Sequence, residues 1–232
     1  MPLSKQRALA EESRSKDHTP PAPVIAVDGP AASGKGTIAR ALARHFGLPH
    51  MDTGLLYRAV ALNLWRWGGD PGNEFEALRA CDDLGIDPDD KELRSEPVSK
   101  IASMISAYPS VRAALLKRQQ DFARQQGGAV LDGRDIGTVI APDADVKLFV
   151  SATPEVRAER RLHELLRRGM TAHYDDVLAD IRARDARDSG RAVAPLKPAP
   201  DALLLDTSEL APEEAIAEAL RRVEERLARA KS

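Results

Sequence analysis

The sequence predicts an α/β fold in which a parallel sheet is covered by helices on both faces. Four short apolar runs of β type, at 24–27, 129–131, 146–150 and 202–205, alternate with longer helical patterns. Apart from Lys147, these runs are apolar throughout, which is typical of strands buried on both faces. Alternating strands and helices imply right-handed crossovers and three layers. Since ligands bind beyond the carboxyl ends of such strands, the loops after the runs are where function is expected.

Helices are expected between these runs. One has Ile38, Leu42 and Phe46 on one face and closes at Gly47. A helix is also expected after each of the runs 129–131 and 146–150, and a later helix is expected to carry Arg184, Arg187 and Arg191 on one face. Residues 68–96 are rich in Asp, Gly and Pro and predict loop with at most short helix. The remaining helices are expected over 55–67, over 98–126 with a break near Pro109, and over 212–229.

Composition bounds the class of protein. The chain has 232 residues, 43% hydrophobic and 30% charged, which suits one α/β domain with small inserts or two compact domains. A formal net charge of −2 gives no overall field that recruits nucleic acid or anionic lipid. The single Cys81 excludes an intrachain disulfide and a zinc site built on several cysteines. Without an apolar run of the ~20 residues that a membrane span needs, we expect a soluble cytoplasmic protein and a monomer.

The first 22 residues differ from the rest. They mix acidic and basic residues, end in Pro20-Pro21 and lack the apolar core of a signal peptide. We expect residues 1–22 to form a flexible extension that the folded part does not need.

A phosphate cradle follows the first apolar run. Gly29, Gly34 and Lys35 stand at P-loop spacing, between a predicted strand and a predicted helix. The glycines let successive backbone N–H groups turn toward an anion, and the helix adds its positive end. Lys35 supplies a mobile charge for the β- and γ-phosphates, and Thr37 can offer a hydroxyl to Mg²⁺. The strict pattern has Ser or Thr directly after the Lys, where this chain has Gly36.

A P-loop alone does not distinguish kinases from GTPases or simple ATPases. GTPases read guanine with an Asn-Lys-x-Asp motif, and neither Asn63 nor Asn73 begins one. A GTPase is therefore disfavoured.

Three further segments predict a second phosphate site. Asp52-Thr53-Gly54 with Arg58 opens a helix, and Asp132-Gly133-Arg134-Asp135 directly follows a predicted strand. The segment 184–191 places several arginines and Asp188 within two helical turns. Taken singly, each segment also fits a helix cap or a surface ion pair. Together they bring guanidinium and carboxylate groups to one crevice, as a phosphorylated second substrate requires.

At these residues the chain resembles bacterial cytidylate kinases. The matching segments are Val27–Pro30 with Gly34–Thr37, Asp52–Gly54 with Tyr57-Arg58, Tyr108-Pro109 with Val111-Arg112, Asp132–Asp135 with Gly137-Thr138, and Arg184–Pro195. The resemblance covers roughly residues 23–228. It implies the three-layer P-loop NTPase fold with a five-stranded parallel sheet, a small CMP-binding insert and a short lid. It also implies phosphoryl transfer from MgATP to CMP or dCMP, in pyrimidine nucleotide metabolism, with Mg²⁺ as cofactor.

The resemblance implies a domain over residues 23–231. Its core would take 23–67 and 127–231, its CMP-binding insert about 68–126 and its lid about 157–175. Family members carry a β-hairpin-like insert before the segment resembling Glu92–Glu96, whereas this chain passes there almost directly from Ile86–Pro88. We therefore expect a smaller CMP-binding subdomain.

The resemblance also assigns residue roles. ATP would be held by the P-loop and the lid, CMP by the second phosphate site, and cytosine by side chains of both the insert and the core. Thr53 replaces a Ser that is common in the family. The implied catalytic residues are Lys35, Arg58, Arg134, Arg160 and Arg184; the ATP-binding residues are Gly29, Pro30, Ala31, Ala32, Ser33, Gly34, Lys35, Gly36, Thr37, Arg157 and Arg161; the CMP-binding residues are Thr53, Tyr57, Arg58, Ser103, Arg112, Asp132, Arg134, Asp135, Arg184, Asp188 and Arg191; and Thr37 would bind Mg²⁺.

Within these CMP-binding residues, Arg58 and Arg134 would hold the phosphate, and Arg184 and Asp188 would reach the ribose. Ser103, Arg112, Asp135 and Arg191 would surround cytosine, with Thr53 nearby.

Two other interpretations stay open from the residues alone. One is a kinase for another monophosphate, such as UMP or AMP. The other is a protein without catalytic activity, either an ATP-binding module or an RNA-binding protein that uses the arginine-rich stretch 157–168. RNA-binding surfaces usually interleave aromatic and basic residues, and this stretch has no aromatic residue, so binding to nucleic acid is not expected.

Overall fold

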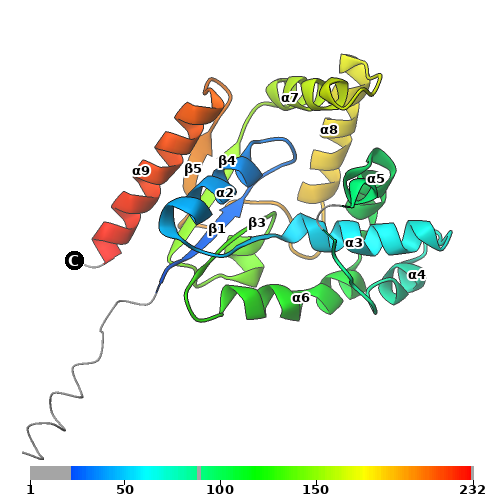
Figure 1. Cartoon of the computed structure of the whole chain (residues 1–232), viewed down its shortest axis with the longest axis horizontal. Coiled ribbons are helices and arrows are strands. Elements are labelled where there is room, and N and C mark those ends of the chain that lie inside the picture. The colour runs from blue at the N-terminus through cyan, green and yellow to red at the C-terminus, as the bar shows by residue number, and fades with distance from the viewer. Residues whose placement is uncertain (1–21, 88–89, 231–232) are drawn as a thin grey trace, which may run out of the picture.

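A five-stranded parallel sheet forms the centre of the molecule. The computed structural model describes residues 22–87 and 90–230; of the predicted extension over 1–22, all but Ala22 lies outside them. In the described part of the chain the strands stand in the order β2-β3-β1-β4-β5, and every pairing is parallel (Figure 1). The predicted fold class is thus confirmed. The strands are β1 (Val24–Asp28), β2 (His50–Asp52), β3 (Ala129–Gly133), β4 (Val146–Ser151) and β5 (Leu203–Asp206).

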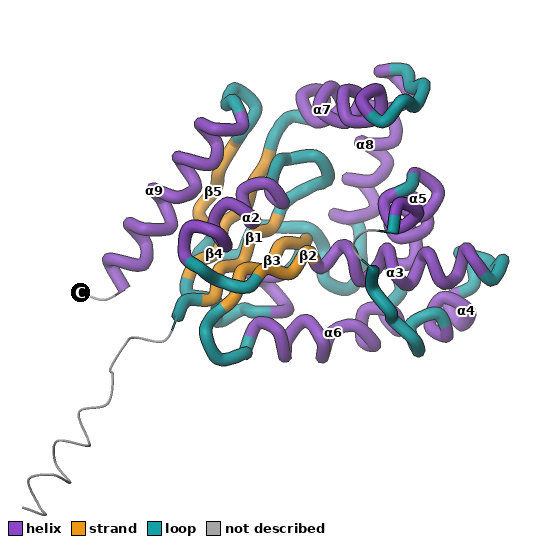
Figure 2. The backbone as a smooth tube through the Cα atoms, in the orientation of Figure 1, coloured by secondary structure: helices purple, strands orange, loops and turns teal. Residues whose placement is uncertain are grey.

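Helices lie on either side of this sheet (Figure 2). They form where the predicted patterns run, with starts set by capping residues such as Asn73 and Thr153, whose side chains accept backbone N–H groups of the first turn. The helices are α2 (Lys35–Phe46), α3 (Thr53–Arg66), α4 (Glu74–Arg79), α5 (Glu96–Ile105), α6 (Pro109–Ala123), α7 (Pro154–Arg167), α8 (Tyr174–Ser189) and α9 (Pro212–Ala230), with short turns η1 (Lys91–Arg94) and η2 (Ile136–Ile140).

The two faces of the sheet carry separate cores. Ile25 and Val27 of β1 face α2 and α9, where Leu42 and Val223 are fully buried. Ala26 of β1 faces the opposite side, in a cluster with Leu131 of β3, Ile136 of η2 and partly buried side chains of α6. Side chains of alternate strand residues therefore fill both layers, as a doubly covered sheet requires.

Two further cores lie outside the sheet. One joins α3 with α4, α5 and α6 through side chains such as Leu64, Ile105 and Leu115. The other joins α7 and α8 through Leu165 and Ile181. Helix α3 therefore packs with the helices of the predicted insert. Helices α7 and α8 form a second unit, which includes the predicted lid. The exact domain boundaries remain a prediction.

Three local expectations were wrong or incomplete. The strand β2 was not predicted by its pattern, because His50–Asp52 is only three residues long and none of them is fully buried. The run 129–131 is followed by the five-residue π-helical turn η2 instead of a longer helix. Helix α8 ends at Ser189 with Gly190 as its cap, so Arg191 is not on the helical face that carries Arg184.

The predicted insert contains only helical and loop segments in its described residues. Its elements are α4, η1, α5 and α6, in agreement with the expectation that it lacks the β-hairpin-like addition. That this makes the subdomain smaller than in relatives stays a prediction.

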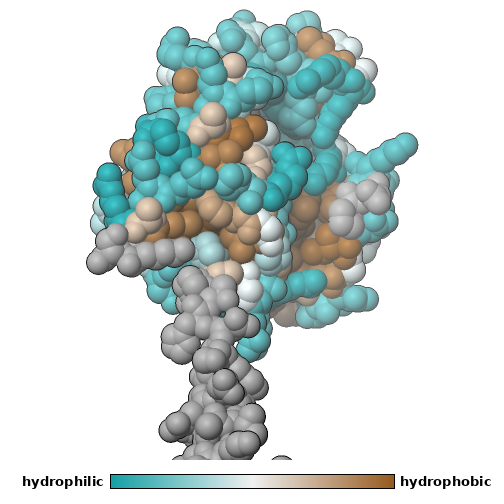
Figure 3. Space-filling model, turned by 60° about the vertical axis from the view of Figure 1, so that its left-hand side comes forward, coloured by the Kyte–Doolittle hydropathy of each residue, from teal (hydrophilic) through white to brown (hydrophobic). Residues whose placement is uncertain are grey.

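The molecular surface is mixed. On the face drawn in Figure 3, hydrophilic residues predominate and hydrophobic ones are interspersed among them. None of the helices in the described ranges is both long and apolar enough to cross a membrane.

Adjacent leucines of β5 allow a matched test of this packing. Leu205 is 1% exposed in the core beneath α9, whereas Leu204 is 61% exposed. We expect Leu205→Ala to lower the free energy of unfolding by ~2–5 kcal/mol, because it removes buried methyl groups and leaves a cavity. Leu204→Ala should change it by less than ~0.5 kcal/mol. Urea unfolding followed by circular dichroism measures both, and equal losses would contradict the assignment of the two faces.

Candidate functional site

The loop between β1 and α2 has the backbone geometry of an anion cradle. A Cβ at Gly29 would lie 2.0 Å from the carbonyl oxygen of Val150, so only glycine lets the chain pass β4 here. Gly34, with φ +88°, is the N-cap of α2, and Gly34 O accepts the N–H groups of Thr37 and Ile38. The turn and the start of the helix thus leave earlier N–H groups for an external anion. The predicted strand, turn and helix around this loop are present.

Other parts of the chain hold this loop in place. The guanidinium of Arg157 donates to Ala31 O at 3.3 Å and to both carboxylate oxygens of Asp185 in α8, at 2.9 and 2.6 Å. The hydroxyl of Thr207 donates to Ser33 O at 3.1 Å. The cradle is therefore anchored from the ends of both β4 and β5.

Lys35, the first residue of α2, carries a cation into a crowded positive region. Its Nζ donates to Pro30 O at 3.4 Å. Burial, with Arg134 and Arg184 adding to it, lowers the pKa of Lys35 to about 7, against a smaller opposite effect of Asp132. A polyanion in the cradle would raise the pKa of Lys35 again, because it would favour the charged ammonium.

Arg134 and Asp188 form the centre of the second predicted phosphate site. Arg134 Nε donates to Asp188 Oδ2 at 2.8 Å, and Arg191 donates to the other carboxylate oxygen. Burial acts to lower the pKa of Arg134, but Asp188 together with Asp132 and Asp52 outweighs it, and the pKa is raised. Although Arg191 lies beyond the end of α8, it therefore still joins this group through Asp188.

Arg184 lies one helical turn before Asp188 and is not neutralised in the same way. Among the described residues its Nε finds no hydrogen-bond partner, although that atom is buried. Burial first, and then Arg134, lower the pKa of Arg184 to about 9, with Arg58 and Arg161 adding to the effect. Several cations thus converge on one place with too few carboxylates, which is the electrostatic pattern of a site for phosphate groups.

A cluster of polar side chains adjoins these cations on the side of the insert. Arg112 of α6 is ion-paired with Asp135, which follows β3, and both are buried. The Arg112 guanidinium carbon lies 5.9 Å from the centre of the Tyr57 ring. Arg191 donates to the Ser106 hydroxyl at 2.8 Å.

Ser103 of α5 is contacted by Arg187, whose guanidinium donates to the Ser103 hydroxyl at 3.2 Å. Arg187 was not among the predicted site residues. The side chains that were expected around cytosine, Ser103, Arg112, Asp135 and Arg191, all lie in this network.

The remaining predicted arginines contact protein groups. Arg58 of α3 donates to Ser99, and burial lowers its pKa to about 10. Arg160 donates to Thr207 Oγ1 and O at 3.0 and 2.6 Å. Arg161 is ion-paired with Glu164 of its own helix and with Glu96 of α5. To contact ATP, Arg160 and Arg161 would have to exchange these partners.

Oxygen donors for Mg²⁺ lie beside the cradle. Thr37 is exposed in the first turn of α2, and a side chain at Gly36 would lie 3.5 Å from Asp132 Oδ2. Asp132 Oδ1 is taken by His50 Nε2 at 2.8 Å, which leaves Oδ2 free to face the helix start. A hydroxyl and a carboxylate oxygen next to a phosphate cradle fit the hard-oxygen preference of Mg²⁺. No cluster of three or more His, Cys, Asp or Glu in the described ranges could hold a metal by itself.

The orientation of Asp132 toward the cradle bears on its predicted role in binding CMP. Thr53, another predicted CMP-binding residue, donates to Asp132 O at 2.8 Å and is buried. The contacts of Asp132 are thus with β2, α3 and the cradle, instead of with the cytosine network.

Sequence reasoning missed three residues that shape the site. Thr207 orders the cradle and Arg160, and His50 orients Asp132. Asp28 accepts two backbone N–H groups of η2. Asp28 directly precedes the glycine of the P-loop pattern and could have been singled out on that ground. His50 and Thr207 carry no local signal, because their partners are remote in the sequence.

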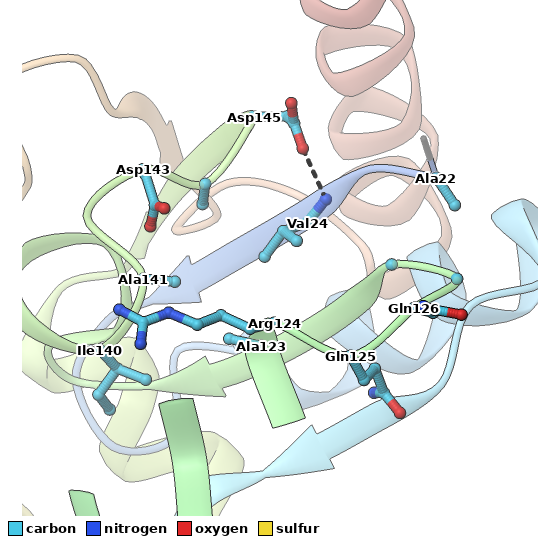
Figure 4. Close-up of a pocket in the computed structure, with 13 residues that line it drawn as sticks. Ala22, Val24, Ala123, Arg124, Gln125, Gln126, Ile140, Ala141, Asp143 and Asp145 are labelled. Carbon is cyan, nitrogen blue, oxygen red and sulfur yellow. Dashed lines mark hydrogen bonds between the residues drawn. The ribbon is translucent and has the colours of Figure 1, made fainter. Parts of the chain in front are cut away.

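A cavity of about 540 Å³ lies elsewhere in the molecule (Figure 4). Val24, Gly128 and Asp145 line it, at the amino ends of the strands, and Arg124 extends toward Ile140 and Ala141. Since Gly29 and Arg134 follow the opposite ends of the strands, this cavity is separate from the candidate site.

Comparisons with known proteins agree with this geometry. The family model for cytidylate kinase matches residues 25–225. A cytidylate kinase of Xanthobacter autotrophicus is 58% identical over 207 residues, which cover 88% of this chain and 99% of that protein. One of Methylocella silvestris is 57% identical over 198 residues, covering 85% and 92%. A crystal structure of an uncharacterized protein from Eubacterium ventriosum, 14% identical, has a TM-score of 0.53 and covers 88% of this chain and 99% of that one, which supports the fold alone. The chain belongs to the cytidylate kinase family.

Proposed function

We propose that the cleft at the carboxyl ends of the strands transfers the γ-phosphoryl group of ATP to CMP or dCMP, giving ADP and CDP or dCDP. The observation that carries this proposal is the excess of buried cationic groups around the end of β3. Arg134 lowers the pKa of both Lys35 and Arg184, and Arg134 and Arg191 share the carboxylate of Asp188, so the site holds more positive charge than its carboxylates balance. Two phosphorylated substrates bring that charge.

ATP occupies the cradle between β1 and α2. Backbone N–H groups of the loop and the start of α2 bind the phosphates, with Lys35 beside them. Thr37 would hold Mg²⁺, with Asp132 on the same side, and the bound ion would reduce the charge of the triphosphate. Placing Asp132 on the metal side instead of the CMP side is supported by the direction of Oδ2 toward Gly36.

CMP occupies the second site. Arg58 and Arg134 bind its phosphate, and Arg184 and Asp188 reach its ribose. The buried Arg112–Asp135 pair, next to Ser103 and Arg191, reads the base, because a carboxylate oxygen accepts from the exocyclic amine of cytosine.

The chemistry asks for positioning and charge stabilisation more than for proton transfer. The attacking phosphate oxygen of CMP is already ionised, so no strong general base is needed. Arg134, Arg184 and Lys35 stabilise the charge that spreads over the transferring group. Rearrangement of Arg160 and Arg161 from Thr207 and Glu96 toward ATP would accompany closure and exclude water. We further propose that the enzyme acts in the cytoplasm as a monomer.

Substrate choice tests the proposed function directly. With MgATP, we expect the purified protein to phosphorylate CMP and dCMP, UMP more slowly, and AMP, GMP and dTMP hardly at all. UMP and dTMP lack the exocyclic amine of cytosine, so Asp135 has no donor to pair with there, and an unpaired buried polar group can reject an analogue by up to ~10⁴-fold. AMP and GMP carry a purine, which is larger than the cytosine that these side chains are proposed to surround. A coupled assay of ADP release across all six monophosphates measures this. Equal turnover of AMP and CMP would exclude a cytidylate kinase.

Arg134 should be essential for turnover. Arg134→Ala removes a cation from the transferring phosphate and is expected to reduce kcat/KM for CMP by ~10³-fold or more. The control is Arg182→Ala in α8, whose side chain is 60% exposed and pairs with Glu155 at the surface; it should leave turnover unchanged. Circular dichroism verifies that both proteins are folded. Normal turnover in a folded Arg134→Ala protein would show that the Asp-Gly-Arg-Asp turn has only a structural role.

Binding of ATP should take up a proton through Lys35. With its pKa lowered to about 7 in the substrate-free protein, Lys35 is mostly neutral at about pH 8. Phosphates next to Lys35 raise this pKa, so ATP binding at that pH should take up about one proton. At about pH 6 the uptake should be markedly smaller, because Lys35 is then already mostly protonated. Calorimetric titration with ATP in two buffers of different ionisation enthalpy measures the uptake. The same uptake in a folded Lys35→Met protein would show that another group is responsible.

A further inference from the structure

The side chain of Asp28 joins the two nucleotide sites. It is 4% exposed at the end of β1, and each of its carboxylate oxygens accepts one backbone N–H: Oδ1 from Ile136 and Oδ2 from Gly137, both at 2.8 Å. In the chain, Asp28 directly precedes Gly29 of the phosphate cradle. Ile136 directly follows Asp135, which pairs with Arg112 in the proposed cytosine pocket.

The two N–H groups that Asp28 binds belong to the first turn of η2. Asp135 is the N-cap residue of that turn, but its side chain makes no capping hydrogen bond. An N-cap Asp normally turns its carboxylate back onto the N–H groups of its own first turn. Because Asp28 already satisfies the Ile136 and Gly137 N–H groups, the carboxylate of Asp135 is free to extend to Arg112.

We propose that Asp28 is a positioning residue for base selection, which caps η2 in place of Asp135 and so keeps the Asp135 carboxylate available to the cytosine amine. The inference rests on the proposed function. Asp28 itself touches neither nucleotide. It binds the loop that contacts cytosine to β1, the strand that leads into the ATP cradle. The CMP site is thereby held in a fixed position relative to the ATP site.

Asp28→Asn tests this with almost no change of shape. An amide has a single acceptor oxygen, so one of the two N–H groups would face an NH₂ group. Asp135, as the N-cap residue of η2, can then turn its carboxylate onto the first turn, at the expense of its contact with Arg112. We expect the KM for CMP to rise by about tenfold or more and the ratio of CMP to UMP turnover to fall, while the KM for ATP stays within about twofold.

The matched control is Asp145→Asn. Asp145 Oδ2 accepts the Val24 N–H at 2.8 Å, at the opposite end of β1, so the same chemical change is made on the same strand away from the site. It should leave both KM values and the CMP to UMP ratio unchanged.

The outcomes separate this inference from a general loss of structure and from the proposed function. A rise in the KM for ATP as large as that for CMP, or an unchanged KM for CMP, would overturn the role of Asp28. Failure of the unaltered protein to phosphorylate CMP would instead overturn the proposed function.

If Asp28→Asn does not fold, amide hydrogen exchange on the unaltered protein tests whether Asp28 caps η2. The Ile136 and Gly137 amides should exchange as slowly without CMP as those of β1, because the cap is already formed. Rapid exchange of both would refute the inference.

Discussion

The main constraint on this structure is that several buried cationic groups lie close together at the carboxyl ends of the strands. Burial disfavours an ammonium or guanidinium group, and neighbouring positive charges disfavour it further, as the lowered pKa values of Lys35 and Arg184 show. Such an arrangement lowers the stability of the free protein unless negatively charged groups compensate for it. Asp188 supplies part of that compensation by accepting from both Arg134 and Arg191. The rest is left for phosphate groups, so the same feature that is unfavourable in the free protein favours substrate binding.

The loops that carry these charges are fixed by side chains from parts of the chain that are remote in the sequence. Arg157 joins the cradle to α8 through Asp185, and Thr207 joins it to the end of β5. Asp28 performs the corresponding task between β1 and η2. The phosphate cradle therefore depends on strands and helices that are distant in the sequence, because its supports come from α7, α8 and the end of β5.

The two outer bodies meet across the site through polar contacts. Glu96 of α5 pairs with Arg161 of α7, and Arg168 donates to Arg94 O at 3.1 Å. Lys100 and Asp180 lie 3.5 Å apart at the exposed rim. Exposed and half-buried ion pairs of this kind contribute little net stability, so they can be exchanged for contacts with substrate at low cost. The apolar cores inside each body, by contrast, keep α3 with α5 and α7 with α8 as units.

The sequence alone determined the fold class, the P-loop and the segments that supply the arginines. Apolar runs and helical periodicity are local properties, and the Gly29–Thr37 spacing is a local motif, so each can be recognised without knowing the neighbours in space. The resemblance to cytidylate kinases on these motifs was confirmed by the family match. The individual roles of the site residues stay predictions.

Only the tertiary structure decided how these groups pair. It showed β2, whose three residues are too few for a pattern, and the end of α8 before Arg191. It showed that Asp132 is oriented by His50, and that Asp28 caps a turn more than 100 residues away. Such contacts form when strands distant in sequence become neighbours in the sheet, and no single stretch of sequence contains the information about which side chains then meet.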